Sequence, residues 1–309
     1  MIALREHVSL APFTTFKIGG QARYYAEASC AIELSEVFDY AEKNKLPLYV
    51  LGGGSNVLFS DAGFPGIVVR IAHGGIKVTD ERIAVGSGMP LLNVVWAARE
   101  AGLAGIEKLA GIPGSFGGAV RGNAGAFGTE IGDVVASVKA LDQHSGMVRE
   151  YKQSECAFSY RNSVFKKNPA LVIISAELKL THGDKSELER IIKETMATRE
   201  AKHPQTAQCA GSFFMNPVVT DGHLLKEFEK DTGNASKDGK LPAGWLIDHV
   251  GLRGKKIGGA QVSDKHPNYL LNTGNATALD IVTLASLVKT KVRDELKVKL
   301  QEEVQYVGF

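Results

Sequence analysis

The sequence predicts a mixed α+β protein built from two or three packed units. Its 309 residues amount to about two domains of ordinary length. Stretches with helical periodicity and stretches with strand character follow one another along the chain, and turn residues bound them. Apolar residues make up 44% and charged residues 23%, as in typical globular proteins, so a disordered chain is excluded.

The predicted elements of the first half alternate between helix and strand. Residues 33–43 have a helical pattern, and β-rich runs at 47–51 and 67–71 are each bounded by turn residues. Apolar residues then recur at helical spacing from residue 91, which predicts an amphipathic helix that ends near Gly102.

Longer elements are predicted further along. Strands are expected at 134–141 and 171–180, and Asp184 is an N-cap for a helix that Pro204 should end. The last helix starts at the capping-box pattern of Thr277 and continues to residue 296, before a short strand at 303–307.

A domain boundary is placed near residue 200. The composition shifts there toward loops, and residues 231–239 form the most linker-like segment of the chain. We therefore expect one domain over 1–200, with a subdivision near residue 72, and a second domain over 201–309.

Charge and hydropathy exclude two classes of partner. The formal net charge is +2, from 36 basic and 34 acidic residues, so no broad positive surface for a nucleic acid is expected. No stretch approaches the roughly 18 apolar residues of a membrane span, and the N-terminus has no apolar leader. The sequence predicts a cytoplasmic protein, and the absence of a heptad pattern favours a monomer.

No metal site or disulfide is predicted. Cys30, Cys156 and Cys209 are odd in number and far apart, which is typical of buried or idle thiols. The eight histidines form no H-E-x-x-H pattern and no close pair.

Three consecutive glycines, Gly52 to Gly54, follow a strand-like run. Without Cβ atoms, their backbone N–H groups can converge on a phosphate or pyrophosphate. An ordinary flexible turn is an equally good interpretation of three glycines alone. Neither the dinucleotide pattern G-x-G-x-x-G nor a Walker loop is present, so a Rossmann site or an NTPase is disfavoured.

A second concentration of glycine covers residues 111–128. Its side chains are nearly all small or apolar, so its backbone can press along a flat ligand while apolar residues anchor it in a core. A tight structural loop is the alternative. Together the two glycine segments indicate a large, extended cofactor.

Several motifs carry a resemblance that spans nearly the whole chain. They are LGGGSNV at 51–57, GIPGSFGG at 111–118, NAGA at 123–126, FSYRNS at 158–163, AGSFF at 210–214 with NP at 216–217, GGAQVS at 258–263, and EV at 303–304. In order and spacing these motifs resemble the UDP-N-acetylenolpyruvoylglucosamine reductase family, in its shorter subtype that lacks an extra loop with a tyrosine.

The resemblance implies a vanillyl-alcohol-oxidase-like (PCMH-type) FAD-binding fold of two subdomains, followed by an α+β substrate-binding domain. Residues 1–200 would bind FAD and residues 201–309 the substrate. The positions that would line FAD are Gly52, Gly53, Gly54, Ser55, Asn56, Gly111, Gly114, Ser115, Gly118, Gly122, Asn123 and Ala124.

The implied reaction is the NADPH-dependent reduction of UDP-N-acetylglucosamine enolpyruvate to UDP-N-acetylmuramate, in peptidoglycan precursor synthesis. Arg161 matches the arginine that binds the substrate carboxylate, for which a guanidinium fork is well suited. Glu303 matches the catalytic glutamate, interpreted as a protonated carboxyl with a pKa raised by burial. Ser212 matches the residue that protonates the substrate.

Four further positions match the substrate site of the family: Tyr160, Lys202, Asn216 and Gln261. Two positions depart from it. Met215 stands where a lysine is common, so one cationic contact is missing, and Gln305 replaces a frequent arginine.

Other interpretations stay open from the sequence alone. Arg161 and Glu303 would otherwise be solvated or ion-paired surface residues, and Ser212 a small residue in a turn, because its surroundings lack G-x-S-x-G. At the level of function, the alternatives are a flavin oxidase on the same fold and a catalytically silent binder of nucleotide sugars.

Overall fold

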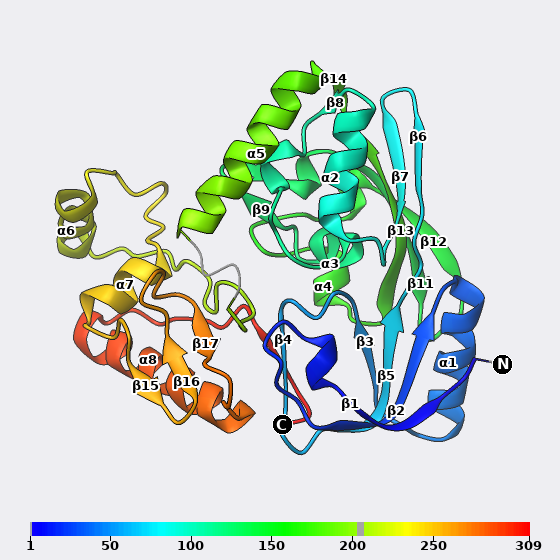
Figure 1. Ribbon diagram of the computed structural model, residues 1–309, viewed down its shortest axis with the longest axis horizontal. Helices are drawn as coiled ribbons and strands as arrows, with labels where there is room; N and C mark the ends of the chain where they lie inside the picture. Colours follow the sequence, from blue (N-terminus) through cyan, green and yellow to red (C-terminus); the bar gives the residue numbers. More distant parts are fainter. Residues whose placement is uncertain (1, 203–206) are drawn as a thin grey trace. The chain divides into compact units, whose positions relative to one another are not determined.

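The computed structural model describes residues 2–202 and 207–309. The chain forms two units (Figure 1). Unit 1 consists of Met1–Val8, Ala22–Gly54 and Pro65–Ala201, and unit 2 consists of Ser9–Gln21, Ser55–Phe64 and Lys202–Phe309. Unit 2 thus includes two segments from the N-terminal part of the chain. The predicted domains, 1–200 and 201–309, place these segments in the first domain instead.

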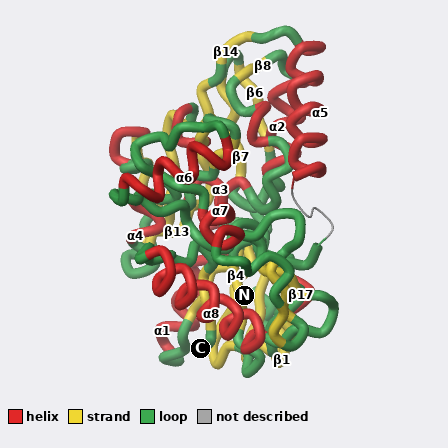
Figure 2. Tube along the Cα trace, turned by 90° about the vertical axis from the view of Figure 1, so that its left-hand side faces the viewer, coloured by secondary structure: helices red, strands yellow, loops and turns green. Residues whose placement is uncertain are grey.

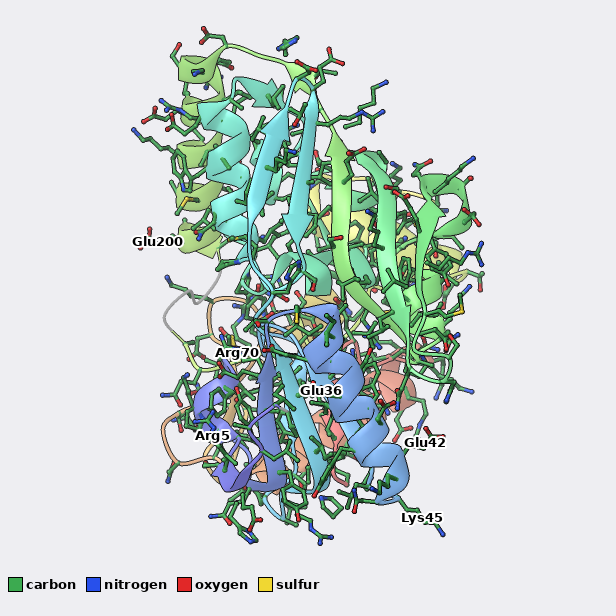
Figure 3. All side chains as sticks on the ribbon, turned by 90° about the vertical axis from the view of Figure 1, so that its right-hand side faces the viewer. Arg5, Glu36, Glu42, Lys45, Arg70 and Glu200 are labelled. Carbon is green, nitrogen blue, oxygen red and sulfur yellow. The ribbon has the colours of Figure 1, made fainter. Side chains whose placement is uncertain are left out.

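A four-stranded sheet with one helix forms the first part of unit 1. Its strand order is β1 (Arg5–Ser9), β2 (Gln21–Ala28), β5 (Phe64–Ile71) and β3 (Leu48–Leu51), and β3 runs parallel to β5. Helix α1 (Ala31–Lys43) covers one face of this sheet with its apolar side (Figure 3). Glu36 of this helix accepts a hydrogen bond from the backbone nitrogen of Ile2 at 2.8 Å.

A five-stranded antiparallel sheet forms the second part of unit 1. Its order is β12 (Val148–Lys152), β11 (Val135–Asp142), β13 (Leu171–Lys179), β7 (Arg82–Gly86) and β6 (Ile76–Thr79). Leu141 and Val172, from β11 and β13, are buried in the same cluster as the apolar side of α1, so the two sheets share core contacts.

Four helices accompany the second sheet: α2 (Leu91–Glu100), α3 (Phe116–Arg121), α4 (Val164–Lys167) and α5 (Lys185–Lys202). Helices α2 and α5 lie side by side (Figures 1 and 2), and Arg99 of α2 is ion-paired with Glu189 of α5. Two short pairs complete unit 1, β8 (Leu103–Ala104) with β14 (Thr181–His182) and β9 (Gly125–Ala126) with β10 (Thr129–Glu130).

Unit 2 joins segments that are far apart in the sequence. Strand β4 (Val57–Phe59) runs parallel to β18 (Gln305–Val307). A three-stranded sheet consists of β15 (Lys256–Ile257), β16 (Ala260–Val262) and β17 (Leu270–Asn272), and its helices are α6 (Gly222–Thr232), α7 (Ala243–His249) and α8 (Ala278–Leu296). Phe16 and Leu58 are buried in the same core as the helices, which explains why the N-terminal segments belong to this unit.

Periodicity predicted the long elements correctly. Helices α1, α2, α5 and α8 and strands β3, β5, β11, β13 and β18 are confirmed. Thr277 and Asp280 form the expected capping box, and Asp184 accepts a hydrogen bond from the backbone nitrogen of Glu187 at 2.9 Å. Pro204, the predicted stop of α5, lies outside the described residues. Helices α3, α6 and α7 were not predicted, and α6 overlaps the start of the supposed linker at 231–239.

Within the described ranges, no helix combines the length and the apolar character needed to cross a membrane.

Candidate functional site

The two glycine-rich segments lie against each other in unit 1. A Cβ atom on Gly52 would be 2.7 Å from Oγ of Ser115, and one on Gly53 would be 2.6 Å from Cα of Gly114. Such separations are too short for any side chain, so only glycine allows this approach of the two backbones. The segments that were each predicted to hold a ligand are therefore neighbours.

The second glycine segment passes directly into helix α3. Ser115 is the N-cap, and its Oγ accepts a hydrogen bond from the backbone nitrogen of Gly118 at 3.3 Å. Gly114 has φ +117°, a conformation that a side chain would strain. The backbone nitrogen of Gly122 donates to the carbonyl of Gly118 at 3.0 Å and closes the helix. This turn places the backbone of Gly114 and Ser115 beside the first glycine segment.

Asn123 holds the loop that follows α3. Asn123 is buried and has a φ of +45°. Its Nδ2 donates to the Glu130 carboxylate at 2.6 Å and to the carbonyl of Ser159 at 3.0 Å. Its Oδ1 accepts from the backbone nitrogen of Gly132 at 3.0 Å. Because the amide is used in this way, Asn123 shapes the loop, and the backbone of Ala124 is fixed next to it by a 2.8 Å hydrogen bond to the carbonyl of Ala119.

Arg161 lies on a tight turn that contacts this loop. Its φ is +55°, a left-handed backbone conformation that is uncommon at residues other than glycine. The guanidinium donates to the carbonyl of Gly125 at 3.0 Å and lies 5.2 Å from the ring centre of Tyr160. Lys166 Nζ donates to the carbonyl of Arg161 at 2.8 Å. The structure thus brings Arg161 and Tyr160 together with the end of the glycine-rich segment.

Ser212 and Glu303 lie on neighbouring segments in unit 2. The backbone nitrogen of Glu303 donates to the carbonyl of Phe213 at 2.8 Å. On the other side, Ser212 is bridged to Tyr269, and Asn268 binds both backbone groups of Phe214. The hydroxyl of Ser212, which is partly exposed, has no hydrogen bond to any other residue that the structure describes. It is therefore available as a proton donor.

The two adjacent glutamates have different surroundings. Glu302 is ion-paired with Nζ of Lys289 on α8 at 2.8 Å. Glu303 is not part of that ion pair, and it has interactions of its own. The raised pKa that we predicted for Glu303 stays a prediction.

Asn56 links the first glycine motif to Glu303. Its Nδ2 donates to the carbonyl of Glu303 at 3.2 Å, and its own carbonyl accepts from the backbone nitrogen of Gln305 at 3.2 Å. These bonds lie at the start of the β4–β18 pair, where Gln305 is opposite Val57. Ser55 precedes Asn56 in the same segment of unit 2.

A cavity of about 260 Å³ opens beside Asn216. Its walls are formed by Asn216, Lys237, Asp238, Lys240 and Pro242. Oδ1 of Asn216 accepts a hydrogen bond from the backbone nitrogen of Ala243, the first residue of α7, at 3.0 Å. The sequence analysis missed both lysines, because they lie in or next to the segment taken for a linker.

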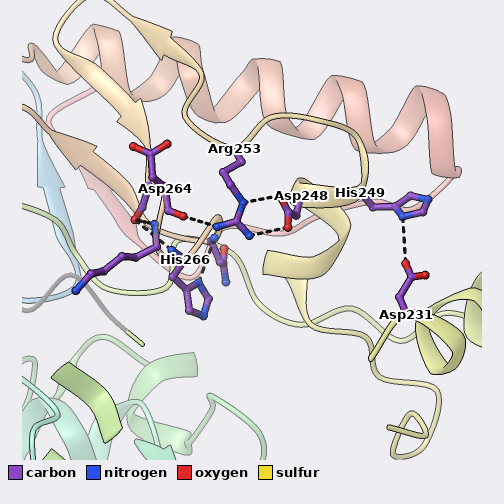
Figure 4. A network of polar contacts seen from close by, with 9 residues as sticks. Asp231, Asp248, His249, Arg253, Asp264 and His266 are labelled. Carbon is purple, nitrogen blue, oxygen red and sulfur yellow. Dashed lines mark hydrogen bonds and ion pairs between the residues drawn. The ribbon is translucent and has the colours of Figure 1, made fainter. Parts of the chain in front are cut away.

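Gln261 belongs to a polar network at the three-stranded sheet. Its Nε2 donates to the carboxylate of Asp264 at 3.0 Å. Arg253 donates to the carbonyl of Asp264 and binds Asp248 with two hydrogen bonds of 2.7 and 2.6 Å (Figure 4). This network fixes the loop that carries Asp264, and through it the side chain of Gln261.

The remaining predicted residues lie near the end of α5. Lys202 is the last residue of that helix and is exposed. One turn earlier, Nε of Arg199 donates to the carbonyl of Gly111 at 3.0 Å. Gly111 is therefore held against α5, at φ +76°.

Two residues near the glycine segments were not predicted. Tyr49 lies on β3, and burial raises its pKa to about 12. Arg121 ends α3, and burial lowers the pKa of its guanidinium, while the Tyr49 phenol acts in the opposite direction. The only sequence signal for Arg121 is a cation inside a segment whose other residues are small or apolar.

Comparisons with known proteins identify relatives of this chain. A family model described as FAD binding domain matches residues 22–151, and one described as UDP-N-acetylenolpyruvoylglucosamine reductase, C-terminal domain, matches residues 203–307. A UDP-N-acetylenolpyruvoylglucosamine reductase of Solibacter usitatus is 37% identical over 312 residues, covering 99% of this chain and 97% of the relative. One of Carboxydothermus hydrogenoformans is 37% identical over 309 residues, covering 98% and 93%.

A solved structure is also similar over the full length. The crystal structure of UDP-N-acetylenolpyruvylglucosamine reductase from Thermus caldophilus has a TM-score of 0.79 and 31% sequence identity, and the match covers 99% of this chain and 100% of that one.

Proposed function

Because the chain belongs to the UDP-N-acetylenolpyruvoylglucosamine reductase family, we propose that it reduces UDP-N-acetylglucosamine enolpyruvate to UDP-N-acetylmuramate with NADPH and FAD, in peptidoglycan precursor synthesis. It is an FAD-dependent oxidoreductase with a vanillyl-alcohol-oxidase-like fold. The observation in the structure that best supports the reaction is the 2.8 Å hydrogen bond from Glu303 to Phe213, which sets Glu303 beside Ser212.

The glycine segments fit an extended dinucleotide. The backbones of Gly53 and Gly114 meet where no Cβ could be accommodated, and a Cβ on Gly118 or Gly122 would meet a single atom each within 4 Å. These residues, with Gly52 and Ser115, would hold FAD through backbone groups. Bound FAD supplies hydride transfer from NADPH to the double bond of the substrate.

Three side chains would handle the charge that develops on the substrate. Arg161 would bind the substrate carboxylate with its planar guanidinium, held by its contact with Gly125. Glu303, if protonated, would donate a hydrogen bond to the developing negative charge. Ser212 would then deliver a proton to the carbon next to the carboxylate, so that the double bond gains one hydride and one proton.

The nucleotide would be bound by polar residues of unit 2, among them Lys202. Asn216 lines the cavity that also contains Lys237 and Lys240, whose ammonium groups suit a diphosphate. These lysines would compensate for Met215, which stands where the family commonly has a cation. Tyr160 and Gln261 are assigned to the substrate by their positions in the family motifs.

We also propose that the protein acts as a monomer in the cytoplasm, and that residues 1–200 bind the cofactor and 201–309 the substrate. Light scattering of the purified protein tests the first point. A particle twice the mass of the chain would contradict it.

Anaerobic absorption spectra test the reaction. Flavin bands should bleach with NADPH and return on addition of the enolpyruvyl nucleotide sugar. If they return only with oxygen, the protein is an oxidase on the same fold. If no flavin binds after reconstitution with FAD, the binder interpretation takes its place.

The Ser212→Ala variant tests the proton donor. NADPH should still bleach the flavin at the parent rate, while reoxidation by the substrate slows by about 100-fold or more. Ser186→Ala is a matched control, because that hydroxyl lies on the exposed start of α5. Normal turnover of Ser212→Ala would remove Ser212 from this role.

A further inference from the structure

One side of helix α3 is less buried than the other and has few side-chain atoms. Its apolar side is buried and consists of Phe116, Gly117, Ala119 and Val120. Gly118, Arg121 and Gly122 are the less buried residues of this stretch. Their spacing of three and four residues places them on the same side of the helix. The face therefore consists of two glycines and one arginine.

Packing does not explain the glycines of this face. A Cβ on Gly117, on the buried side, would be 2.5 Å from Cβ of Ser87, so that glycine is needed for packing. A Cβ on Gly118 would meet only Oγ of Ser115, at 3.3 Å, and one on Gly122 only the carbonyl oxygen of Gly118, at 3.5 Å. Apart from this single contact at each position, no other atom of the described residues comes within 4 Å of either Cβ.

Arg121 differs from two ion-paired arginines of unit 1, Arg99 and Arg190. Arg99 is ion-paired with Glu100 and Glu189, and Arg190 with Glu187 and Glu194. For Arg121, no carboxylate of the described residues is within ion-pair distance, although burial lowers its pKa. A half-buried cation without a counter-charge is costly, because its hydration is lost without compensation.

The start of α3 lies next to the first glycine segment, because a Cβ on Gly52 would be 2.7 Å from Oγ of Ser115. The phenol of Tyr49, on β3, and the guanidinium of Arg121 influence each other's pKa, which agrees with this placement. Tyr49 lies three residues before Gly52 on strand β3, about 10 Å at the usual rise of a strand. Arg121 lies six residues after Ser115, about 9 Å along a helix. Both residues are within reach of one extended ligand bound at the cradle, which consists of the two neighbouring glycine segments at 52–54 and 111–128.

We propose that the guanidinium of Arg121 binds a phosphate oxygen of the bound dinucleotide, across the face formed by Gly118 and Gly122. This inference rests on the proposed function, since it requires that the cradle holds FAD. The carbonyl groups at the C-terminal end of a helix repel an anion, so a phosphate near the end of α3 needs a cation there. The fork of an arginine also suits two phosphate oxygens.

The test compares the FAD affinity of apoprotein variants, measured by the quenching of flavin fluorescence at low and at high ionic strength. Arg121→Met should weaken FAD binding by about tenfold or more at low ionic strength, the effect of losing a charge-assisted hydrogen bond. Its affinity should also depend less on salt than that of the parent protein. Arg121→Lys should keep the salt dependence and part of the affinity.

Two controls separate the possible outcomes. Arg190→Met, on α5 of the same unit, removes an arginine whose carboxylate partners are on its own helix and should bind FAD like the parent. The melting temperature of apo Arg121→Met should not fall, because no ion pair is lost; if that variant does not fold, Arg121→Gln replaces it.

Parent-like affinity and salt dependence in Arg121→Met would overturn the proposal. The proposal would also be overturned if Arg121→Met and Arg121→Lys lost FAD affinity equally at low and high ionic strength. That result would show that the side chain of Arg121 acts through its shape and not through its charge. If the parent apoprotein itself does not bind FAD, the proposed function fails together with this inference.

Discussion

Replacing Gly53 by alanine tests the contact between the two glycine segments. The new Cβ would be 2.6 Å from Cα of Gly114 and 2.7 Å from the backbone nitrogen of Ser115. Non-bonded carbon atoms prefer about 3.5–4.0 Å, so the segments must separate by about 1 Å. The obstructing atoms belong to the backbone and cannot rotate away. The φ of Gly53 is not in the left-handed region, so the effect is one of space alone.

The size of the effect follows from this displacement. Overpacking of this kind costs about 1–3 kcal/mol. In a protein of this size, each kcal/mol lowers the melting temperature by about 2–4 °C. The apoprotein should therefore melt about 2–12 °C lower by circular dichroism. FAD should also bind more weakly in a fluorescence titration, because the backbone groups that line the cradle move apart.

Gly222→Ala is the matched control for this prediction. Gly222 begins α6, and a Cβ there would meet no atom within 4 Å. Alanine should leave the FAD affinity unchanged and keep or raise the melting temperature, since it favours helix. If Gly53→Ala melts and binds FAD like Gly222→Ala, the two segments do not touch as described.

The other predictions concern one carboxyl group, one helix position and the thiols. Glu303→Gln keeps a donor but cannot titrate, so turnover should lose its pH dependence on that group; a pH profile like that of the parent would contradict the role. Gly118→Ala would bring a Cβ to 3.3 Å from the N-cap hydroxyl of Ser115 and should weaken FAD binding, and unchanged FAD affinity would show that this face of α3 does not contact FAD. With an aromatic disulfide reagent near neutral pH, only the partly exposed Cys30 should react in the folded protein, because burial raises the pKa of Cys156 to about 11 and also raises that of Cys209. The pKa of Cys156 is higher in the folded protein than in the unfolded chain. The protonated thiol therefore contributes fully to stability below the unfolded pKa, and this contribution is lost as the pH rises toward 11. Fast reaction of a second thiol would contradict the burial of Cys156 and Cys209.

Local patterns predicted the amphipathic elements because their apolar faces are long. Helix α8 repeats apolar residues over 19 residues and begins with a capping box, so its sequence is sufficient. Helix α7 has seven residues, of which Ala243, Gly244, Leu246 and Ile247 are buried, and so short a run has no clear period. The β4–β18 pair joins Val57 to Gln305, a contact that no local pattern contains.

The candidate site shows the same division between local and tertiary information. Glycine composition favoured a ligand at residues 52–54 and 111–128, beside the alternatives of a flexible turn and a tight structural loop, because a missing side chain is visible in a sequence. The environment of Arg121 could not be foreseen, since an unpaired and half-buried cation is defined by what surrounds it. The same holds for Lys237 and Lys240, which matter only because the fold places them on the walls of a cavity with Asn216.

Helix α3 is poorly suited to stability on its own. At six residues it is too short to persist alone, and each interior glycine costs about 0.5–1 kcal/mol relative to alanine. Burial of Phe116 and Val120 holds it in place, and Gly117 is required by the contact with Ser87. Among the described residues, a Cβ on Gly118 would meet only the hydroxyl of Ser115, and no carboxylate lies beside Arg121. A ligand with a flat or narrow body and a phosphate explains both features together, whereas a purely structural loop explains neither.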